Sequence, residues 1–140
     1  MKLNNPADLI VTNNKKQILL VKRAKTQKEF PDCWSFPGGG CETGETAEEA
    51  IKREIKEELN CKIKKLQYFK SYYYKGKGYH SRVLYFYGTI SGKIKLQEKE
   101  LSDFKWFELN NDLLKLKLAY EQEEVVKDFM KAVSDKLVSS

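Results

Sequence analysis

The sequence has few of the residues that build disulfide frameworks or zinc sites. Its 140 residues include three cysteines, Cys33, Cys41 and Cys61, and a single histidine, His80. The cysteines are odd in number and form no CxxC pair, so we expect neither a disulfide framework nor a zinc centre. Cys61 stands in an apolar pattern, and we interpret it as a small buried hydrophobic residue.

Long hydrophobic runs are also missing. Apolar runs such as QILLV at 17–21 are far shorter than the roughly 20 residues of a membrane-spanning helix. Residues 1–11 lack the apolar stretch and cleavage site of a secretory signal. Only three prolines occur, and 33% of the residues are charged, as is common in globular proteins. We therefore expect a cytoplasmic protein with no membrane partner.

The length predicts one domain, residues 1–140, with a core that needs no disulfide. Lysine and arginine number 26 against 20 acidic residues, a net charge of +6. This balance suits an anionic partner, although a chain from a lysine-rich proteome would have the same net charge without such a partner. A monomer and a homodimer are both compatible with the sequence.

Apolar and turn patterns predict an α+β fold with a mixed sheet and two main helices. Strands are expected at 7–12, 16–23, 62–74, 79–90 and 104–109, with short extended pieces at 34–40 and 92–97. Helices are expected at 46–59 and 121–133, and a loop or short helix at 110–120.

The helix predicted at 46–59 has clear ends and a clear apolar stripe. Thr46 followed by Glu49 is a capping box, and Asn60 suits the left-handed residue after a helix. The stripe expected to pack on a sheet consists of Ala47, Ile51, Ile55 and Leu59.

Three glutamates of this helix do not fit a solvated surface. Glu58 falls inside the apolar arc, and Glu54 and Glu57 lie at its edge. A buried carboxylate costs several kcal/mol without a partner, and clustered carboxylates repel one another. A magnesium ion relieves both problems, because hard cations prefer oxygen ligands. Glu–Lys pairs of an ordinary acidic helix account for the other glutamates, but not for Glu58 or for the three glycines at 38–40.

The segment 39–61 resembles the signature of the Nudix hydrolases, G-x5-E-x7-R-E-U-x-E-E-x-G-U, where U is a bulky apolar residue. The matching residues are Gly39, Glu45, Arg53, Glu54, Ile55, Glu57, Glu58 and Cys61, with Asn60 in place of the last glycine. ILLVKRA and WSFPGGG upstream and KELSDFKWFEL downstream are similar to the MutT-like branch. The resemblance implies a Nudix-type α/β/α sandwich in which the signature forms a loop–helix–loop.

The resemblance also implies an enzyme that uses Mg²⁺ or Mn²⁺ to cleave a nucleoside diphosphate linked to another group. We expect a nucleoside triphosphate to be split into monophosphate and pyrophosphate. The implied metal ligands are Glu54, Glu57, Glu58, the carbonyl of Gly39, and Glu100, for which Glu98 is the alternative. Glu45 is implied to support the site or to reach the metal through a water, Arg53 to orient the glutamates by ion pairing, and Glu54 or Glu100 to act as general base.

Substrate contacts are implied at other positions. Gly38 and Gly39 let the backbone approach phosphates. Arg23 resembles a phosphate-binding position, although a solvated arginine is nearly as compatible. Tyr120 or Glu121 stands where MutT has a purine-reading asparagine, which weakens the case for an oxidised guanine nucleotide and leaves ordinary nucleoside triphosphates open.

Residues 70–82 interleave aromatics with Lys70, Lys75, Lys77 and Arg82. This basic hairpin could bind nucleic acid. The favoured interpretation is an ordinary β-hairpin with one face buried and the other exposed to solvent. Tyr79 has a spacing similar to that of diadenosine polyphosphate hydrolases. Hydrolysis of RNA 5′ ends is a further alternative, as is a non-catalytic nucleotide- or RNA-binding module, which would have been free to lose the three glutamates.

Overall fold

The computed structural model describes residues 5–138. These residues form two compact units, one built from 5–11 and 37–97, the other from 12–36 and 98–138. In this part of the chain no helix is long and apolar enough to cross a membrane.

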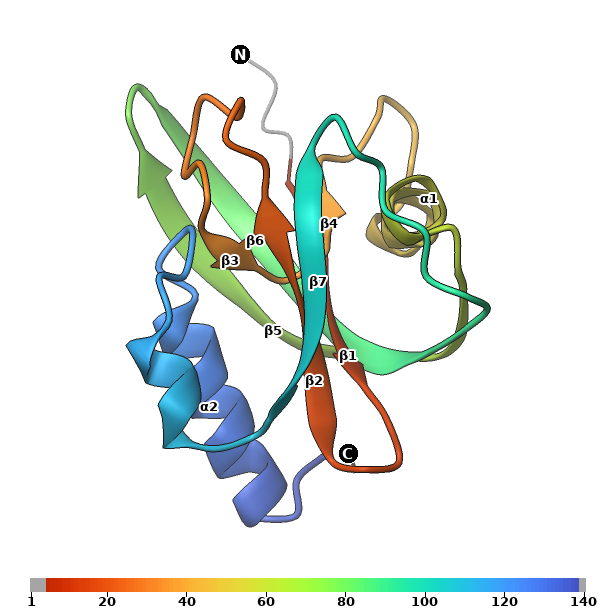
Figure 1. Ribbon diagram of the computed structural model, residues 1–140, viewed down its shortest axis with the longest axis vertical. Helices are drawn as coiled ribbons and strands as arrows, with labels where there is room; N and C mark the ends of the chain where they lie inside the picture. The colour runs from red at the N-terminus through yellow and green to blue at the C-terminus, as the bar shows by residue number, and fades with distance from the viewer. Residues whose placement is uncertain (1–4, 139–140) are drawn as a thin grey trace. The chain divides into compact units, whose positions relative to one another are not determined.

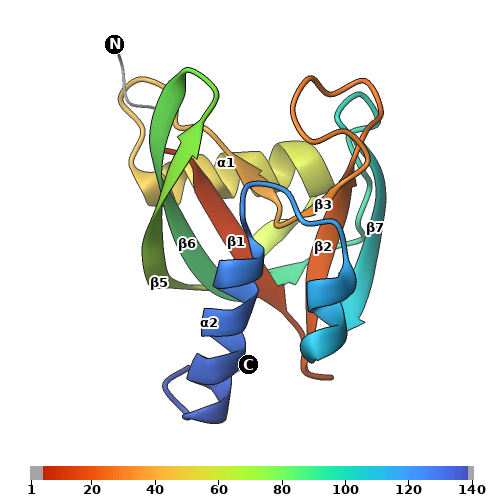
Figure 2. The same cartoon turned by 90° about the vertical axis from the view of Figure 1, so that its left-hand side faces the viewer.

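The first unit contains a mixed sheet. β1 (Ala7–Thr12) pairs in parallel with β6 (Tyr79–Ser91) and antiparallel with β4 (Gly38–Gly39). β6 pairs antiparallel with β5 (Lys62–Gly76), and the two strands form a long twisted ribbon (Figure 2). Every residue of β1 is buried, which explains why its sequence is mainly apolar and does not alternate regularly with polar residues.

Helix α1 (Ala47–Leu59) begins and ends as predicted. The Thr46 hydroxyl accepts a hydrogen bond from the Glu49 amide at 3.1 Å, and the Glu49 carboxylate accepts one from the Thr46 amide at 3.0 Å. Asn60 closes the helix in the left-handed conformation, with φ 58° and ψ 34°. The predicted capping box and the predicted role of Asn60 are confirmed.

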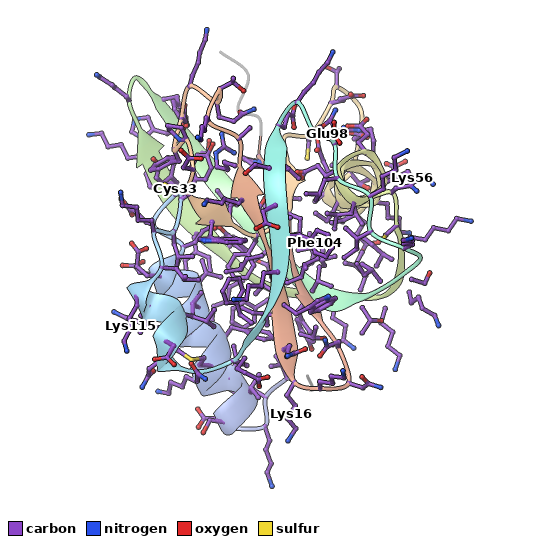
Figure 3. All side chains as sticks on the ribbon, viewed as in Figure 1. Lys16, Cys33, Lys56, Glu98, Phe104 and Lys115 are labelled. Atoms are coloured by element: carbon purple, nitrogen blue, oxygen red, sulfur yellow. The ribbon has the colours of Figure 1, made fainter. Side chains whose placement is uncertain are left out.

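One face of α1 is buried, and it contacts β4 and β5 (Figure 1). The buried residues are Ala50, Ile51, Ile55, Leu59 and, as expected, Glu58. The prediction was wrong at Ala47, the first residue of the helix, which is half-buried; Ala50, next to Ile51, is buried instead. Lys56 lies on the outer side of the helix (Figure 3).

The second unit joins three strands to two helical segments. β2 (Gln17–Arg23) pairs antiparallel with β3 (Trp34–Ser35) and with β7 (Leu101–Glu108). A 3₁₀ helix, η1 (Asn111–Lys115), contacts α2 (Glu123–Ser134). The buried side chains of α2 are Val125, Val126, Phe129 and Ala132, whereas Met130 and Val133 are half-buried.

The extended piece predicted at 92–97 is not a strand. The Lys95 amide donates to the Leu59 carbonyl at 2.9 Å, and the Gln97 amide donates to the Glu58 carbonyl at 3.0 Å. These carbonyls belong to the last turn of α1, which has no intrahelical donors for them. The segment therefore closes the end of a helix rather than extending the sheet.

The left-handed conformation of Asn60 gives a testable stability difference. We expect Asn60→Gly to unfold with a free energy close to that of the native chain, because glycine adopts this conformation without strain. Asn60→Ala should be about 1 kcal/mol less stable, since its Cβ is strained there. Urea unfolding followed by circular dichroism measures both. Equal stability of the two variants would contradict the assigned role of Asn60.

Candidate active site

The glycines before α1 hold the buried glutamate of that helix. The Gly38 amide donates to Glu58 Oε1 at 2.9 Å, and Glu58 is only 5% exposed. Gly38 has φ +150°, and a Cβ there would lie 2.3 Å from the carbonyl oxygen of Ala7 and 2.3 Å from Asp8 Oδ1. Only glycine can therefore bring its amide to Glu58 while lying against β1.

Gly39 lies equally close to a second glutamate. A Cβ on Gly39 would be 2.6 Å from Cδ of Glu54 and 2.8 Å from both of its carboxylate oxygens. The absence of a side chain at Gly39 thus leaves room for the Glu54 carboxylate beside the backbone of β4. Glu54 and Glu58, one turn apart on α1, are in this way both placed against β4 (Gly38–Gly39), which we call the glycine strand.

Arg53 binds the remaining carboxylates. Its Nε and Nη2 contact the two oxygens of Glu45 at 2.8 and 2.9 Å, a bidentate pair. Its Nη1 donates to Glu54 at 2.9 Å and to Glu57 at 3.2 Å. Nη2 also donates to the Gly40 carbonyl at 2.9 Å. One guanidinium therefore ties the loop before α1 to two glutamates of the helix, and the ion pairing predicted for Arg53 is present.

The ion pairs and the burial around Arg53 shift the pKa values of Arg53 and of its neighbours. The hydrogen bonds from Arg53, followed by the one from the Glu42 amide, lower the pKa of the Glu45 carboxyl. Bonding to Glu45 in turn raises the pKa of Arg53. Burial, with a smaller effect of Glu45, raises the pKa of the Cys41 thiol. Cys41 is therefore a protonated thiol at neutral pH.

The donor chemistry of this cluster suits a hard cation. Glu54, Glu57 and Glu58 supply carboxylate oxygens, and the adjacent glycine strand supplies backbone carbonyls, the ligand types that Mg²⁺ and Mn²⁺ take. Among residues 5–138, however, no group of three or more histidine, cysteine, aspartate or glutamate side chains is gathered in a way that could hold a metal ion. The Arg53 guanidinium forms ion pairs with Glu54 and Glu57 and balances their charges.

Two of the predicted residues lie in the second unit and contact each other. The Arg23 guanidinium lies 5.3 Å from the ring centroid of Tyr120. It donates from Nε to the Glu29 carbonyl at 2.9 Å and from Nη2 to Gln27 Oε1 at 3.2 Å. The Phe30 ring packs on Tyr120 with centroids 4.7 Å apart. Arg23 is thus a positioned side chain rather than a freely solvated one.

The other acidic candidates are exposed residues of the second unit. Glu100 precedes β7, and its backbone carbonyl accepts from the Ala24 amide at 2.8 Å. Glu98 lies two residues earlier and is also exposed (Figure 3). Their roles stay predictions.

Sequence patterns did not identify several polar residues near these sites. Gln122 is fully buried, and its Oε1 accepts from the Phe36 amide at 3.1 Å. Asp8 is a buried carboxylate in an apolar strand beside Gly38. A polar residue inside an otherwise apolar strand was the available signal for Asp8. For Gln122 the available signal was its spacing three and four residues before Val125 and Val126, which places it on the apolar face of the helix expected at 121–133.

Comparison with known proteins decides the family. The model of the NUDIX domain matches residues 2–129. This chain belongs to the NUDIX family. The predicted recognition and the predicted enzyme class, a Nudix hydrolase, are confirmed.

Two curated relatives illustrate the similarity of this Nudix chain. An ADP-ribose pyrophosphatase of Methanocaldococcus jannaschii is 36% identical over 126 residues, which are 88% of this chain and 70% of that protein. An 8-oxo-dGTP diphosphatase of Buchnera aphidicola is 29% identical over 121 residues, covering 85% of this chain and 88% of the relative.

Solved structures confirm the predicted fold. The crystal structure of a MutT protein from Methanosarcina mazei Go1 is similar with a TM-score of 0.81, covering 98% of this chain and 96% of that one at 19% identity. The mixed sheet and two helices are those of the Nudix fold, so the predicted α+β class is correct.

The Arg53–Glu45 pair predicts a titration difference. Because the pKa of Glu45 is lowered in the folded chain, its contribution to stability is present at neutral pH and is lost as pH falls through that pKa. In Arg53→Gln the pKa of Glu45 should rise toward its ordinary value, as measured by carboxyl carbon NMR. Arg53→Lys, which keeps the charge but not the fork, should give an intermediate value.

Lys52→Gln is the matched control, since it removes an exposed cation of the same helix. It should leave the Glu45 titration as in the native chain. An unchanged Glu45 pKa in Arg53→Gln would contradict the dominance of this pair.

Proposed function

We propose that residues 1–140 act as a single Nudix domain that hydrolyses a phosphoric anhydride in a nucleoside diphosphate linked to another group. The observation that carries the proposal is the Arg53 network, in which one guanidinium joins Glu45 of the loop to Glu54 and Glu57 of α1. It links three carboxylates and the Gly40 carbonyl through one side chain, and carboxylates beside a glycine-rich backbone are groups that cations and phosphates bind.

We propose Mg²⁺, or Mn²⁺, as the cofactor. Glu54, Glu57 and Glu58 would hold it together with the Gly39 carbonyl, and Glu100 is the further candidate. When bound, such an ion neutralises phosphate oxygens and lowers the pKa of a coordinated water. Arg53 is proposed to keep Glu54 and Glu57 in position, and Glu45 to keep Arg53 in position.

The hydrolysis needs a group that accepts a proton from the attacking water. Glu54 is proposed for this role, with Glu100 as the alternative, because its carboxylate lies directly against the backbone of Gly39, where the substrate phosphates are proposed to approach. Glu58 is bonded to the Gly38 amide and is therefore oriented toward the glycine strand. The P–O bond to the leaving group breaks as the water oxygen bonds to phosphorus.

Arg23 and Tyr120 are proposed to bind substrate. Arg23 is held by Gln27 and Glu29, so little side-chain freedom would be lost when its guanidinium contacts a phosphate oxygen. The Tyr120 ring, packed on Phe30, offers an aromatic surface for a base or sugar. Gly38 and Gly39 would let the phosphates approach the backbone.

A nucleoside triphosphate is the proposed substrate, with release of monophosphate and pyrophosphate. ADP-ribose is a second candidate, because the 36% identical relative is an ADP-ribose pyrophosphatase. Its hydrolysis would release AMP and ribose 5-phosphate. The two candidates differ in their products, so one assay distinguishes them.

A substrate panel with Mg²⁺ tests the proposal. It contains unmodified and oxidised nucleoside triphosphates, ADP-ribose and diadenosine polyphosphates, with products identified by chromatography. We expect one class to be cleaved, and Glu57→Gln to lower kcat at least about 100-fold if the carboxylate holds the cation.

Glu48→Gln is the matched control, because Glu48 is an exposed glutamate in the first turn of α1. It should retain the native kcat. Cleavage of no compound, or equal activity of Glu57→Gln and Glu48→Gln, would refute the proposal and favour a non-catalytic nucleotide-binding role.

A further inference from the structure

The positive charge of the chain is concentrated in one segment of the first unit. Residues 60–97 contain eight lysines and one arginine but no aspartate or glutamate. The rest of the chain has 17 basic against 20 acidic residues, a balance of −3. The net charge of +6 therefore comes entirely from the segment that forms the β5–β6 hairpin.

One face of this hairpin is aromatic and basic. Directly opposed residues of an antiparallel pair share a face, and the pairs are Lys75 with His80, Tyr73 with Arg82, and Tyr68 with Phe86. Alternate residues along β6 connect these pairs on one side. We call Tyr68, Tyr73, Lys75, His80 and Arg82 the hairpin face; all five are exposed.

The two tyrosines of the hairpin face are unusually exposed for large aromatic side chains. Tyr73 is 66% exposed and Tyr68 is 54% exposed. The Tyr73 hydroxyl forms a hydrogen bond with His80 Nδ1, and the two rings lie 5.5 Å apart. Tyr68 packs edge-on against Phe86 with centroids 5.7 Å apart. Both rings are thus oriented by neighbours while they stay accessible.

The opposite face of the hairpin accounts for its folding. Tyr85 and Val83 are buried there, and Tyr72 packs edge-on against Tyr85 with centroids 5.4 Å apart. Among the described strands β5 pairs with β6 alone, so it is an edge strand. Its lysines also discourage pairing of this edge with another chain. Neither role requires exposed tyrosines, nor an arginine paired across the strands with one of them.

We propose that the hairpin face binds a single strand of nucleic acid. Bases would stack on Tyr73 and Tyr68, and the phosphates would contact Arg82, Lys75 and the neighbouring lysines. Charge complementarity favours a polyanion, because no carboxylate occurs between residues 60 and 97. Exposed rings favour a single strand over a duplex, since paired bases offer no free π-face. This binding surface shares no residue with the glutamates of α1 and does not depend on hydrolysis.

Fluorescence anisotropy with a 3′-labelled RNA of twelve uridines tests the proposal. The RNA carries a 5′-hydroxyl end, and EDTA is present, so the α1 glutamates are offered neither anhydride nor metal. We expect the native chain to bind at 50 mM salt and more weakly at 200 mM, with a slope of log K against log salt near −0.7 per phosphate contact.

Three variants of the hairpin face separate stacking from charge. Tyr73→Ala should bind about tenfold more weakly with an unchanged salt slope, because a stacking surface is lost. Tyr73→Phe keeps the ring and should bind like the native chain. Arg82→Gln should bind more weakly and reduce the slope by about 0.7. Circular dichroism verifies that each variant is folded.

Matched controls come from exposed residues elsewhere. Phe104→Ala removes an aromatic ring that is 36% exposed on β7 (Figure 3), and Lys131→Gln removes an exposed cation of α2. Both should bind RNA like the native chain. No RNA binding at 50 mM salt, equal losses in Tyr73→Ala and Phe104→Ala, or equal affinity for a duplex would overturn the proposal. So would Tyr73-dependent binding to phosphatidylserine vesicles without binding to RNA.

Discussion

The bonds of Arg53 organise the candidate active site. A segment with seven glutamates between residues 36 and 61 would repel itself without a compensating cation. Arg53 contacts both oxygens of Glu45 and one oxygen each of Glu54 and Glu57, and it also binds the Gly40 carbonyl. The loop before α1, the helix and the residue after β4 are joined through this one planar side chain. Lysine cannot reproduce its forked set of donors.

Charge is divided within the first unit in a way that suits its proposed chemistry. The glutamates of α1 are the proposed cation ligands, and a bound cation would attract phosphates. The β5–β6 hairpin of the same unit lies within residues 60–97, which include basic residues but no acidic ones. Its charge therefore suits a polyanion. A weakly acidic remainder and a basic hairpin explain how a chain of net charge +6 contains a carboxylate-rich site.

Local rules predicted the parts of the site that depend on neighbouring residues. The capping box of Thr46, the left-handed Asn60 and the burial of Glu58 each follow from spacing along one helix. The sequence could not reveal contacts between distant segments. Residues 92–97 looked like a strand but cap α1, and Arg23 meets Tyr120 across 97 positions only because their elements fold together. Patterns could not identify the partner of Gln122 either, because the Phe36 amide that it binds is 86 residues away.

The most direct test of the central claim is Mn²⁺ binding, followed by electron paramagnetic resonance without nucleotide. If the α1 glutamates hold the cation, the native chain binds Mn²⁺, and Glu54→Gln binds it at least about tenfold more weakly. Glu49→Gln, a change at an exposed glutamate of the same helix, should bind like the native chain. Equal Mn²⁺ affinity of the native chain and Glu54→Gln would contradict the account.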